Sequence, residues 1–268
     1  MQKKKKHQLF KIRGDISRKV YMITVVATFV GILALWSLLS YGNLVSPTFL
    51  PSPGKVWASM VTNVQSGDFW GYVWISFYRV LMGYLITCLL AIPIGILAGT
   101  FKIAEAIFVP VTEFIRYMPA TAFIPLIIVW IGLGESAKIS VIFVGCFFQM
   151  VLMVADNAKS VSGELLQASY TLGASRFQVL RKVLFPALLP DLMNTMRLIM
   201  GWAWSYLVAA ELFAASSGLG FMIMRAQRYM QTEVIFLGIL VIGLLGLIID
   251  RLFALMNKKL FPWAEGGR

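Results

Sequence analysis

The sequence predicts an all-α integral membrane protein with about six transmembrane helices. The 268 residues are 59% hydrophobic and 13% charged, with a mean hydropathy of +0.79. Soluble domains are about half apolar and about one quarter charged. Crossing the hydrocarbon of a bilayer takes roughly 20 mainly apolar residues. Six stretches meet this requirement, namely 21–40, 76–100, 107–131, 138–157, 192–213 and 234–256.

The basic residues are divided unequally between the two sides of this arrangement. If the N-terminus is cytoplasmic, seventeen Lys and Arg flank the spans on the inner side, and Lys55, Arg225 and Arg228 are the three in outer loops. Because cytoplasmic loops are enriched in Lys and Arg, we expect a multi-pass membrane protein with both termini cytoplasmic. The net charge of +12 lies beside apolar spans, so no nucleic-acid partner is expected.

The chain opens with a basic segment, residues 1–20, that is expected to be a cytoplasmic tail. Its lysine run is explained by topology, and binding of anionic membrane lipid is the alternative. No small-residue cleavage site follows the first span, which is therefore expected to be an uncleaved helix. Residues 21–157 are assigned to transmembrane helices 1–4.

The first outer loop contains the stretch LPSPGKVWASMVTNVQSG. Ser52 can cap a helix whose first residue is Pro53, and the apolar residues that follow fall on one helical face. The pattern predicts a short amphipathic helix near 53–65 on the outer membrane surface. A plain connecting loop is the alternative.

The third span carries charged residues and prolines at membrane depth. Arg116 lies about nine residues into the span if the helix starts at Ile107, which is roughly 14 Å at 1.5 Å per residue. Ionisable groups at this depth usually face protein or a water-filled path. Arg116 is therefore a candidate for attracting an anion, and a structural pair with Glu113 is the alternative. Pro119 permits a kink or a break that exposes carbonyl groups to a cavity.

The stretch GELLQASYTLGASRFQVLRKVLFPALLP, from Gly163 to Pro190, is too polar to cross a bilayer. Leu165, Ala168, Ser169 and Leu172 form one helical face, and Gly173 follows where a left-handed residue would end the helix. Ser175 and Gln178 have the spacing of a capping box, which starts a second helix, and Pro186 is expected to disrupt that helix. Residues 158–190 are thus predicted to be a cytoplasmic loop that contains a helix, a turn and a second helix.

Residues 191–256 are assigned to transmembrane helices 5 and 6, and 257–268 to a cytoplasmic C-terminal tail. Glu211 lies at the end of the fifth span before the small-residue run AASSGLG and is a candidate for shaping an outer gate. A structural cap or an inter-chain hydrogen bond is the alternative for Glu211. Trp204 is a candidate for the translocation path, with packing or an interfacial position as its alternative. Cys88 and Cys146 lie within apolar spans and are expected to be small core residues without a disulfide.

The loop resembles the cytoplasmic EAA loop of the membrane subunits of ABC importers. The match consists of Gln167-Ala168-Ser169, then Gly173, then Val183-Leu184-Phe185-Pro186. The leading Glu of that signature is Gln here, and the second Ala is Ser. The stretches FIRYMPATAFIPLIIVWIGLGESAKI and GWAWSYLVAAELFAASSGLGFMI are similar to the nitrate/sulfonate/taurine branch of these permeases. The resemblance covers the chain from about residue 30.

The resemblance implies a type I ABC importer permease fold with a cytoplasmic coupling-helix pair that docks on an ATPase. It also implies a location in the bacterial inner (plasma) membrane. It implies as partners a second copy of the chain, two ATP-binding subunits and an extracytoplasmic substrate-binding protein. It implies no catalytic, cofactor or metal site in this chain, with ATP and Mg on the partner ATPase. The solute would be small and anionic, such as taurine or another sulfonate, nitrate or bicarbonate. The ATPase-coupling residues would be Gln167, Ala168, Ser169, Leu172, Gly173, Ala174, Ser175, Arg176 and Phe177.

Two other classes of protein compete with this interpretation. A stand-alone channel or secondary carrier for a small solute would give the capped cytoplasmic helix pair no partner. A membrane enzyme would need His, Asp, Glu or Cys clustered at one depth, and these residues are scattered. The sequence contains no G-x-x-x-x-G-K-[ST] string for binding nucleotide phosphates, so the resemblance places ATP hydrolysis on a separate subunit.

Overall fold

Residues 16–263 are the part of the chain that this computed structural model describes, and they form helices joined by short turns, with no strand among them. The predicted all-α membrane fold is therefore confirmed. Residues 1–15 of the predicted basic tail and residues 264–268 of the predicted C-terminal tail lie outside the described residues.

Five helical stretches are long and apolar enough to cross a membrane. Each contains one of the predicted spans and extends beyond it, because a hydropathy window detects only the apolar centre of a helix. The five are α1 (Arg18–Tyr41), α3 (Asp68–Thr100), α6 (Glu135–Ser160), Arg176–Phe213, which contains most of α9 (Phe185–Ala214), and α11 (Thr232–Leu260).

The third predicted span, 107–131, is not one straight helix. α4 (Lys102–Arg116) is followed by the 3-10 turn η1 (Ala120–Phe123) and by α5 (Ile124–Ile131), and the two halves are bent by 89°. Pro119 stands at the break with an extended backbone. Proline lacks an N–H donor and disfavours a helical residue before it, so a break at this position has a local cause. Counting the bent pair as one span gives six.

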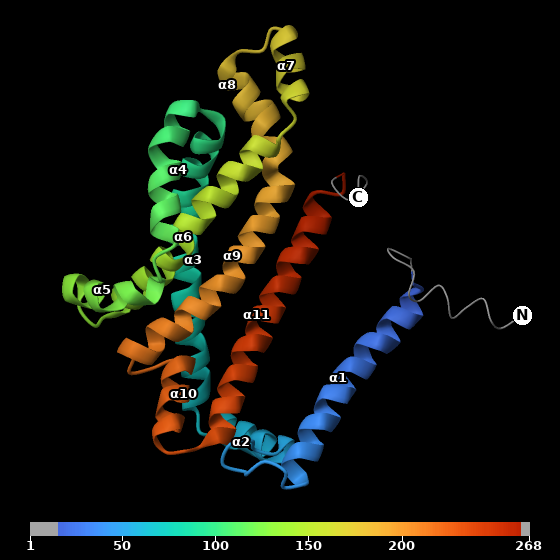
Figure 1. Ribbon diagram of the computed structural model, residues 1–268, viewed down its shortest axis with the longest axis vertical. Coiled ribbons are helices and arrows are strands. Elements are labelled where there is room, and N and C mark those ends of the chain that lie inside the picture. Colours follow the sequence, from blue (N-terminus) through green and yellow to red (C-terminus); the bar gives the residue numbers. More distant parts are fainter. Residues whose placement is uncertain (1–15, 264–268) are drawn as a thin grey trace, which may run out of the picture.

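The core lies between α3, α6 and α9 (Figure 1). A Cβ added to Gly95 of α3 would lie 2.6 Å from Cβ of Val154 in α6. A Cβ added to Gly99 would lie 2.4 Å from the carbonyl oxygen of Ala155. Small residues four positions apart allow membrane helices to approach this closely. Cys88 and Cys146 are both buried in this core as free thiols, as the sequence predicts.

The two ends of the molecule differ in what they carry (Figure 1). α7 (Gly163–Thr171) and α8 (Arg176–Val179) project at one end, toward which the last turn of α11 also points. α2 (Pro53–Gln65) and α10 (Leu219–Arg228) lie at the opposite end. The hydroxyl of Ser52 accepts a hydrogen bond from the backbone N–H of Lys55 at 3.4 Å, which caps α2.

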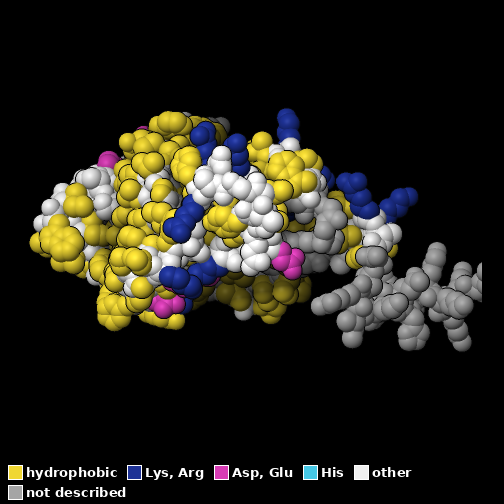
Figure 2. All heavy atoms as spheres, turned by 90° about the horizontal axis from the view of Figure 1, so that it is seen from above, with side chains coloured by type: hydrophobic (Ala, Val, Ile, Leu, Met, Phe, Trp, Pro, Cys, Tyr) yellow, Lys and Arg dark blue, Asp and Glu magenta, His cyan; other side chains and the backbone are white. Residues whose placement is uncertain are grey.

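Figure 2 views the molecule from the α7–α8 end and shows Lys and Arg side chains spread over it among hydrophobic ones. Lys102 and Lys159 share one carboxylate: the Nζ atom of each lies 2.8 Å from a carboxylate oxygen of Glu105. These contacts join the start of α4 to the end of α6. The described basic residues of the predicted inner segments are Arg18, Lys19, Lys102, Lys159, Arg176, Arg181, Lys182, Arg251, Lys258 and Lys259.

Candidate functional site

The α7–α8 pair is built around the turn that the sequence predicts at Gly173. Gly173 has φ +83°, a left-handed conformation that glycine adopts without steric cost. The backbone N–H of Ala174 donates to the carbonyl of Ser169 at 3.1 Å, and that of Gly173 donates to the carbonyl of Tyr170 at 2.9 Å. These are the two hydrogen bonds of a Schellman motif, which satisfies carbonyl groups at a helix end.

The second helix of the pair starts at the predicted capping box. The backbone N–H of Ser175 donates to Oε1 of Gln178 at 2.8 Å, and the N–H of Gln178 donates to Oγ of Ser175 at 3.4 Å. Both helix ends that meet at the turn are therefore satisfied locally. The turn between the two helices is therefore held by backbone hydrogen bonds and caps within the pair.

Large apolar side chains stand exposed at the tip of this pair. Leu172 is 88% exposed and Phe177 is 70% exposed, while Val179 behind them is buried. Two exposed apolar side chains on a short capped turn form a surface suited to contact with another protein. Of the other predicted coupling residues, Gln167, Ala168, Gly173, Ser175 and Arg176 are exposed, and Ser169 and Ala174 are half-buried.

The prediction that Pro186 disrupts the second helix is wrong. α8 continues through the π-helical turn η2 (Leu180–Leu184) into α9, and Pro186 lies in the first turn of α9. A proline is tolerated in the first turn because its missing N–H would have no partner there. The wider π-helical turn η2 interrupts the α-helical hydrogen-bond pattern before Pro186. The α7–α8 pair therefore connects to α9 without a non-helical break.

Arg116 lies at the bend of the third span rather than within a straight helix. The helix begins at Lys102, not at Ile107, and Arg116 is its last residue. Its Nη2 donates to the hydroxyl of Tyr117 at 3.2 Å, and the guanidinium carbon lies 4.9 Å from the centre of the same ring. Glu113 is exposed and forms no ion pair with Arg116. Pro119 is also exposed, directly beyond the break.

A small pocket opens at this bend. Arg116 lines it together with Gln149 of α6 and with Trp202 and Tyr206 of α9. The sequence did not single out Gln149 or Tyr206, because side chains from different helices meet here only through tertiary packing. The pocket, about 50 Å³ in volume, brings a cation, an amide and aromatic side chains together.

Trp204 is predicted to be a translocation-path residue, with packing as its alternative, and it lies in the packed core. It is 4% exposed and packs in the core of α3, α6 and α9. Its Cδ1 is 3.9 Å from the position that a Cβ on Gly246 of α11 would occupy. Trp202, two residues earlier and therefore on another face of α9, is the tryptophan that lines the pocket at the bend.

Glu211 is fully enclosed and fully hydrogen-bonded, with 1% of its surface exposed. Its carboxylate accepts hydrogen bonds from the hydroxyl of Ser76 at 2.7 Å, from the backbone N–H of Gly220 at 2.7 Å and from Nη1 of Arg79 at 2.5 Å. Glu211 therefore connects the end of α9 to α3 and to the start of α10. This arrangement corresponds to the structural cap given above as an alternative for Glu211, with an additional ion pair to Arg79.

Arg79 is the centre of this network, and the sequence analysis missed it. Its guanidinium, 0% exposed, also donates to both carboxylate oxygens of Glu135 at 2.6 and 2.7 Å and to the carbonyl oxygen and hydroxyl of Ser217 at 2.7 and 3.1 Å. Glu135 in turn holds Nζ of Lys138 at 2.8 Å. The sequence could have indicated Arg79, because an ionisable residue inside a span, here 76–100, usually has a partner or faces a water-filled path.

The network fixes the turn between α9 and α10. Gly218 has φ +112°, and a Cβ there would lie 2.3 Å from Oε1 of Glu211 and 2.6 Å from Nη1 of Arg79. The small-residue run after Glu211 is thus needed for the turn to close over the two buried charges. With two acids and two bases, the cluster of Arg79, Glu135, Lys138 and Glu211 is balanced in charge, which offsets the cost of burying Arg79 and Glu211.

The site has no metal-ligating cluster within residues 16–263: no group of three or more His, Cys, Asp or Glu side chains there could hold an ion. The carboxylates of the buried network are instead occupied by Arg79 and Lys138. The buried network thus connects α3, α6, α9 and the turn that leads into α10.

Comparisons with known proteins agree on the class. Residues 91–262 match the family described as "Binding-protein-dependent transport system inner membrane component". The chain is 33% identical, over 94% of its length and 93% of the relative's, to the taurine transport system permease protein of Escherichia coli (strain K12). It is 35% identical, over 87% and 84%, to the putative aliphatic sulfonates transport permease protein of Bacillus subtilis (strain 168).

The chain is also similar to a more distant relative and to a solved structure. The bicarbonate transport system permease protein of a Synechocystis strain is 28% identical over 94% of this chain and 91% of its own. In fold, the chain is similar to the inward-facing MetNI methionine ABC transporter, with a TM-score of 0.57 and 23% identity. That match covers 70% of this chain and 97% of the solved one.

Proposed function

The chain belongs to the family of binding-protein-dependent transport system inner membrane components, and from that premise we propose that two copies of it form the path of an ATP-driven importer for a small anion. It is a permease component of an ABC importer, a transport subunit rather than an enzyme. The parts that we propose are the number of subunits, the partnership with an ATPase and the class of solute.

The observation that carries the proposal is the exposed tip of the α7–α8 pair. Leu172 and Phe177 are 88% and 70% exposed on a turn held by a Schellman motif and a capping box. We propose that an ATPase subunit covers this tip and that ATP and Mg bind on that subunit. Because η2 and α9 continue from α8 without a joint, displacement of the tip would pass directly to α9.

The orientation in the membrane is proposed from charge. The end that carries α7, α8 and most described Lys and Arg would face the cytoplasm, as expected for loops rich in basic residues. The opposite end, with α2 and α10, would face outward and meet the binding protein. This proposal keeps the predicted segments: tails at 1–20 and 257–268, spans within 21–157 and 191–256, the outer helix at 53–65 and the coupling loop at 158–190.

The solute class is proposed from the relatives and from the pocket at the bend. The relatives are named for taurine, aliphatic sulfonates and bicarbonate, all of which carry an anionic group. Arg116 supplies a cation to the pocket at the bend. We propose that Arg116 attracts the anion, that Pro119 and Glu113 shape the bend, and that Glu211 holds the outer end of α9 closed.

The assembly is tested by purification. The permease produced together with its ATPase and extracted in mild detergent should elute as one complex that contains two copies of each subunit. Mass measurement of the eluted complex checks the stoichiometry. A stable lone monomer that transports solute in vesicles would instead support the stand-alone carrier and overturn the proposal.

Arg116→Ala is expected to weaken uptake of the anion more than it lowers the amount of protein. Loss of one exposed charge contact corresponds to about 1 kcal/mol or less, so the KM for the solute should rise by up to about fivefold. Uptake by vesicles at several solute concentrations measures this.

The control for Arg116→Ala is Lys102→Ala at the other end of α4. It also removes one positive charge, but the Lys102 side chain is 92% exposed and does not line the pocket. It should leave the KM unchanged. Equal KM values in wild type and Arg116→Ala would remove Arg116 from the path.

A further inference from the structure

Arg197 of α9 and Asp250 of α11 form an ion pair between the two helices. Nε of Arg197 donates to Oδ1 of Asp250, and Nη2 donates to Oδ2 at 2.7 Å. The side chains of Arg197 and Asp250 are 37% and 36% exposed. The pair is therefore fully formed, yet more than a third of each side chain is open to whatever surrounds this part of the molecule.

The pair lies at membrane depth. Arg197 is about five residues inside the predicted span 192–213, and Asp250 is about six residues inside 234–256, counted from the span ends nearest the α7–α8 pair. At 1.5 Å per residue, these depths are roughly 8 and 9 Å along the helices. Ionisable groups at such a depth are costly in lipid, and they usually face protein or a water-filled path. A half-exposed ion pair in this position indicates that water, and not lipid, reaches this side of α9 and α11.

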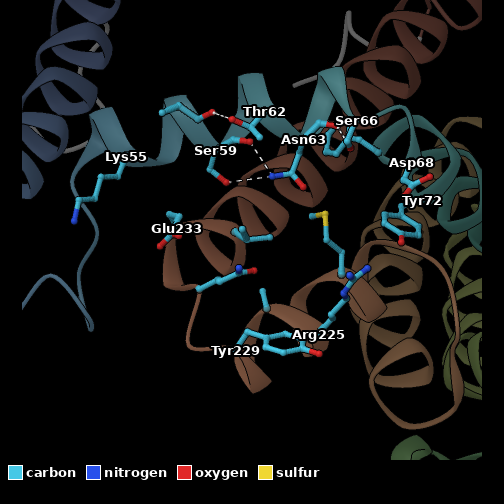
Figure 3. A pocket seen from close by; sticks show the side chains of 16 residues that line it. Lys55, Ser59, Thr62, Asn63, Ser66, Asp68, Tyr72, Arg225, Tyr229 and Glu233 are labelled. Carbon is cyan, nitrogen blue, oxygen red and sulfur yellow. Dashed lines mark hydrogen bonds between the residues drawn. The ribbon is translucent and has the colours of Figure 1, made fainter.

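Exposed charges at the end opposite the α7–α8 pair have a simpler explanation. Figure 3 shows an open groove there, about 860 Å³ in volume, between α2, α10 and the starts of α3 and α11. Its charged lining residues are Lys55, Asp68, Arg225 and Glu233. These residues lie at helix ends or on short helices, where water reaches them from outside the membrane. Arg197 and Asp250 lie well inside long apolar helices, so the same explanation does not apply to them.

The side of α9 next to the pair is open. Four exposed residues at positions i, i+3, i+4 and i+7 share this side of the helix, and we call them the open face of α9: Leu198, Gly201, Trp202 and Ser205. Leu198 directly follows Arg197, and Trp202 lines the pocket that contains Arg116. The open face therefore runs from the ion pair to the pocket at the bend.

We propose that Arg197 is a second contact for the transported anion, on the inner part of the path, and that Asp250 limits how tightly Arg197 holds it. The inference rests on the proposed function, in which Arg116 is the first contact. A guanidinium has five N–H donors, and Asp250 occupies two of them. The other donors remain for a solute, while the carboxylate neutralises part of the positive charge. Such a group attracts an anion weakly enough to release it, as conduction through successive sites requires.

A clamp between α9 and α11 with no contact to solute is the alternative explanation. Asn194 and Asn257 already join these helices through a side-chain hydrogen bond of 2.8 Å. The chain also shows how it encloses a pair that only connects helices, because the side chains of Arg79 and Glu211 are both 0% exposed. The exposure of Arg197 and Asp250 is what a clamp leaves unexplained.

Taurine loaded inside vesicles tests the contact from the cytoplasmic side. The vesicles contain the permease–ATPase complex, and the internal taurine concentration that halves the initial rate of ATP-driven uptake is measured. Asp250→Asn leaves Arg197 with its full charge, so this concentration should fall by up to about fivefold. Arg197→Gln leaves a carboxylate that repels the anion, so the concentration should rise. The double variant removes both charges and should lie between the two single variants.

The matched control is Arg251→Gln, which removes one positive charge at nearly the same depth. Arg251 is exposed and follows Asp250 on α11, so it points about 100° away around the helix. This variant should leave the inhibitory concentration of taurine as it is in wild type. An equal shift in Arg251→Gln and Arg197→Gln would overturn the contact, as would single variants that lower the rate of uptake without shifting this concentration, which is the result that a clamp predicts.

Thiol labelling tests access to water without any change to the pair. Leu198→Cys and Ser205→Cys on the open face should react with a membrane-impermeant thiol reagent added from the cytoplasmic side. Leu97→Cys on α3, which is also exposed near the inner end of its span, should not react. Wild type is the blank, because Cys88 and Cys146 are buried. Absence of a difference between the cysteines of the open face and Leu97→Cys would overturn the water-accessible path along α9.

Failure of the proposed function has a different signature. Wild-type vesicles that take up no taurine, aliphatic sulfonate or bicarbonate with ATP would overturn the anion importer, whatever the labelling shows. If wild type takes up taurine, but Asp250→Asn and Arg197→Gln do not shift the inhibitory concentration in opposite directions, only the contact at Arg197 is wrong.

Discussion

Gly173→Arg is expected to abolish ATP-driven uptake while the chain still inserts into the membrane. Gly173 is exposed at the turn of the α7–α8 pair, and an added Cβ would meet no heavy atom within 4 Å. The arginine side chain would therefore project from the tip beside Leu172 and Phe177, where the proposed ATPase contact must form. Uptake by vesicles measures transport, and co-elution of the ATPase with the permease measures docking. Both should be lost.

Two further variants separate blocked docking from a strained turn. Because φ is +83° at Gly173, any other residue costs local energy, about 1–2 kcal/mol for an ordinary one. Asn tolerates the left-handed region better than Ala. Gly173→Asn should thus retain most uptake and Gly173→Ala somewhat less, whereas Gly173→Arg should retain none.

Gly163→Arg is the control for adding a bulky cation to the pair. Gly163 lies at the start of α7, and no heavy atom lies within 4 Å of its added Cβ. This variant should transport nearly as well as wild type, because it leaves the tip free. Normal uptake by Gly173→Arg, or an equal loss of uptake in Gly163→Arg, would refute the assignment of the tip to coupling.

The α7–α8 pair could be predicted from the sequence because its structure is determined locally. The helix end at Gly173 and the capping box of Ser175 and Gln178 involve backbone groups within a few residues of one another. The six spans are predictable for a similar reason, since length and hydropathy are local quantities. The π-helical turn before Pro186 was not predictable, because helix continuation there depends on how η2 packs against α7 and α9.

The buried network could not be assembled from the sequence. Arg79 is 56 residues from Glu135 and 132 residues from Glu211, and no spacing rule joins positions this far apart. The sequence shows only that Arg79 and Glu211 lie in spans, where each needs a partner. Similarly, Pro119 indicates a break in the third span, but the 89° bend depends on the packing of α5 and η1 against α6.

Arg79→Met is expected to destabilise the protein by about 3–5 kcal/mol, the cost of leaving a buried charge without its partner. Glu211 would keep its carboxylate fully buried with only Ser76 and Gly220 as hydrogen-bond donors. Glu135 would retain Lys138, so the uncompensated charge would fall on Glu211. Thermal unfolding in detergent, followed as loss of the monodisperse peak in size exclusion, measures the change.

The double variant Arg79→Met with Glu211→Leu decides whether charge is the cause. It leaves Glu135 and Lys138 as a neutral pair and should be more stable than Arg79→Met alone, because exchanging a buried ion pair for apolar residues is far less costly than breaking it. Lys102→Met, whose side chain is 92% exposed, should leave the unfolding temperature nearly unchanged. If the double variant is less stable than Arg79→Met, the shape of the two side chains, and not their charge, holds the turn between α9 and α10 in place.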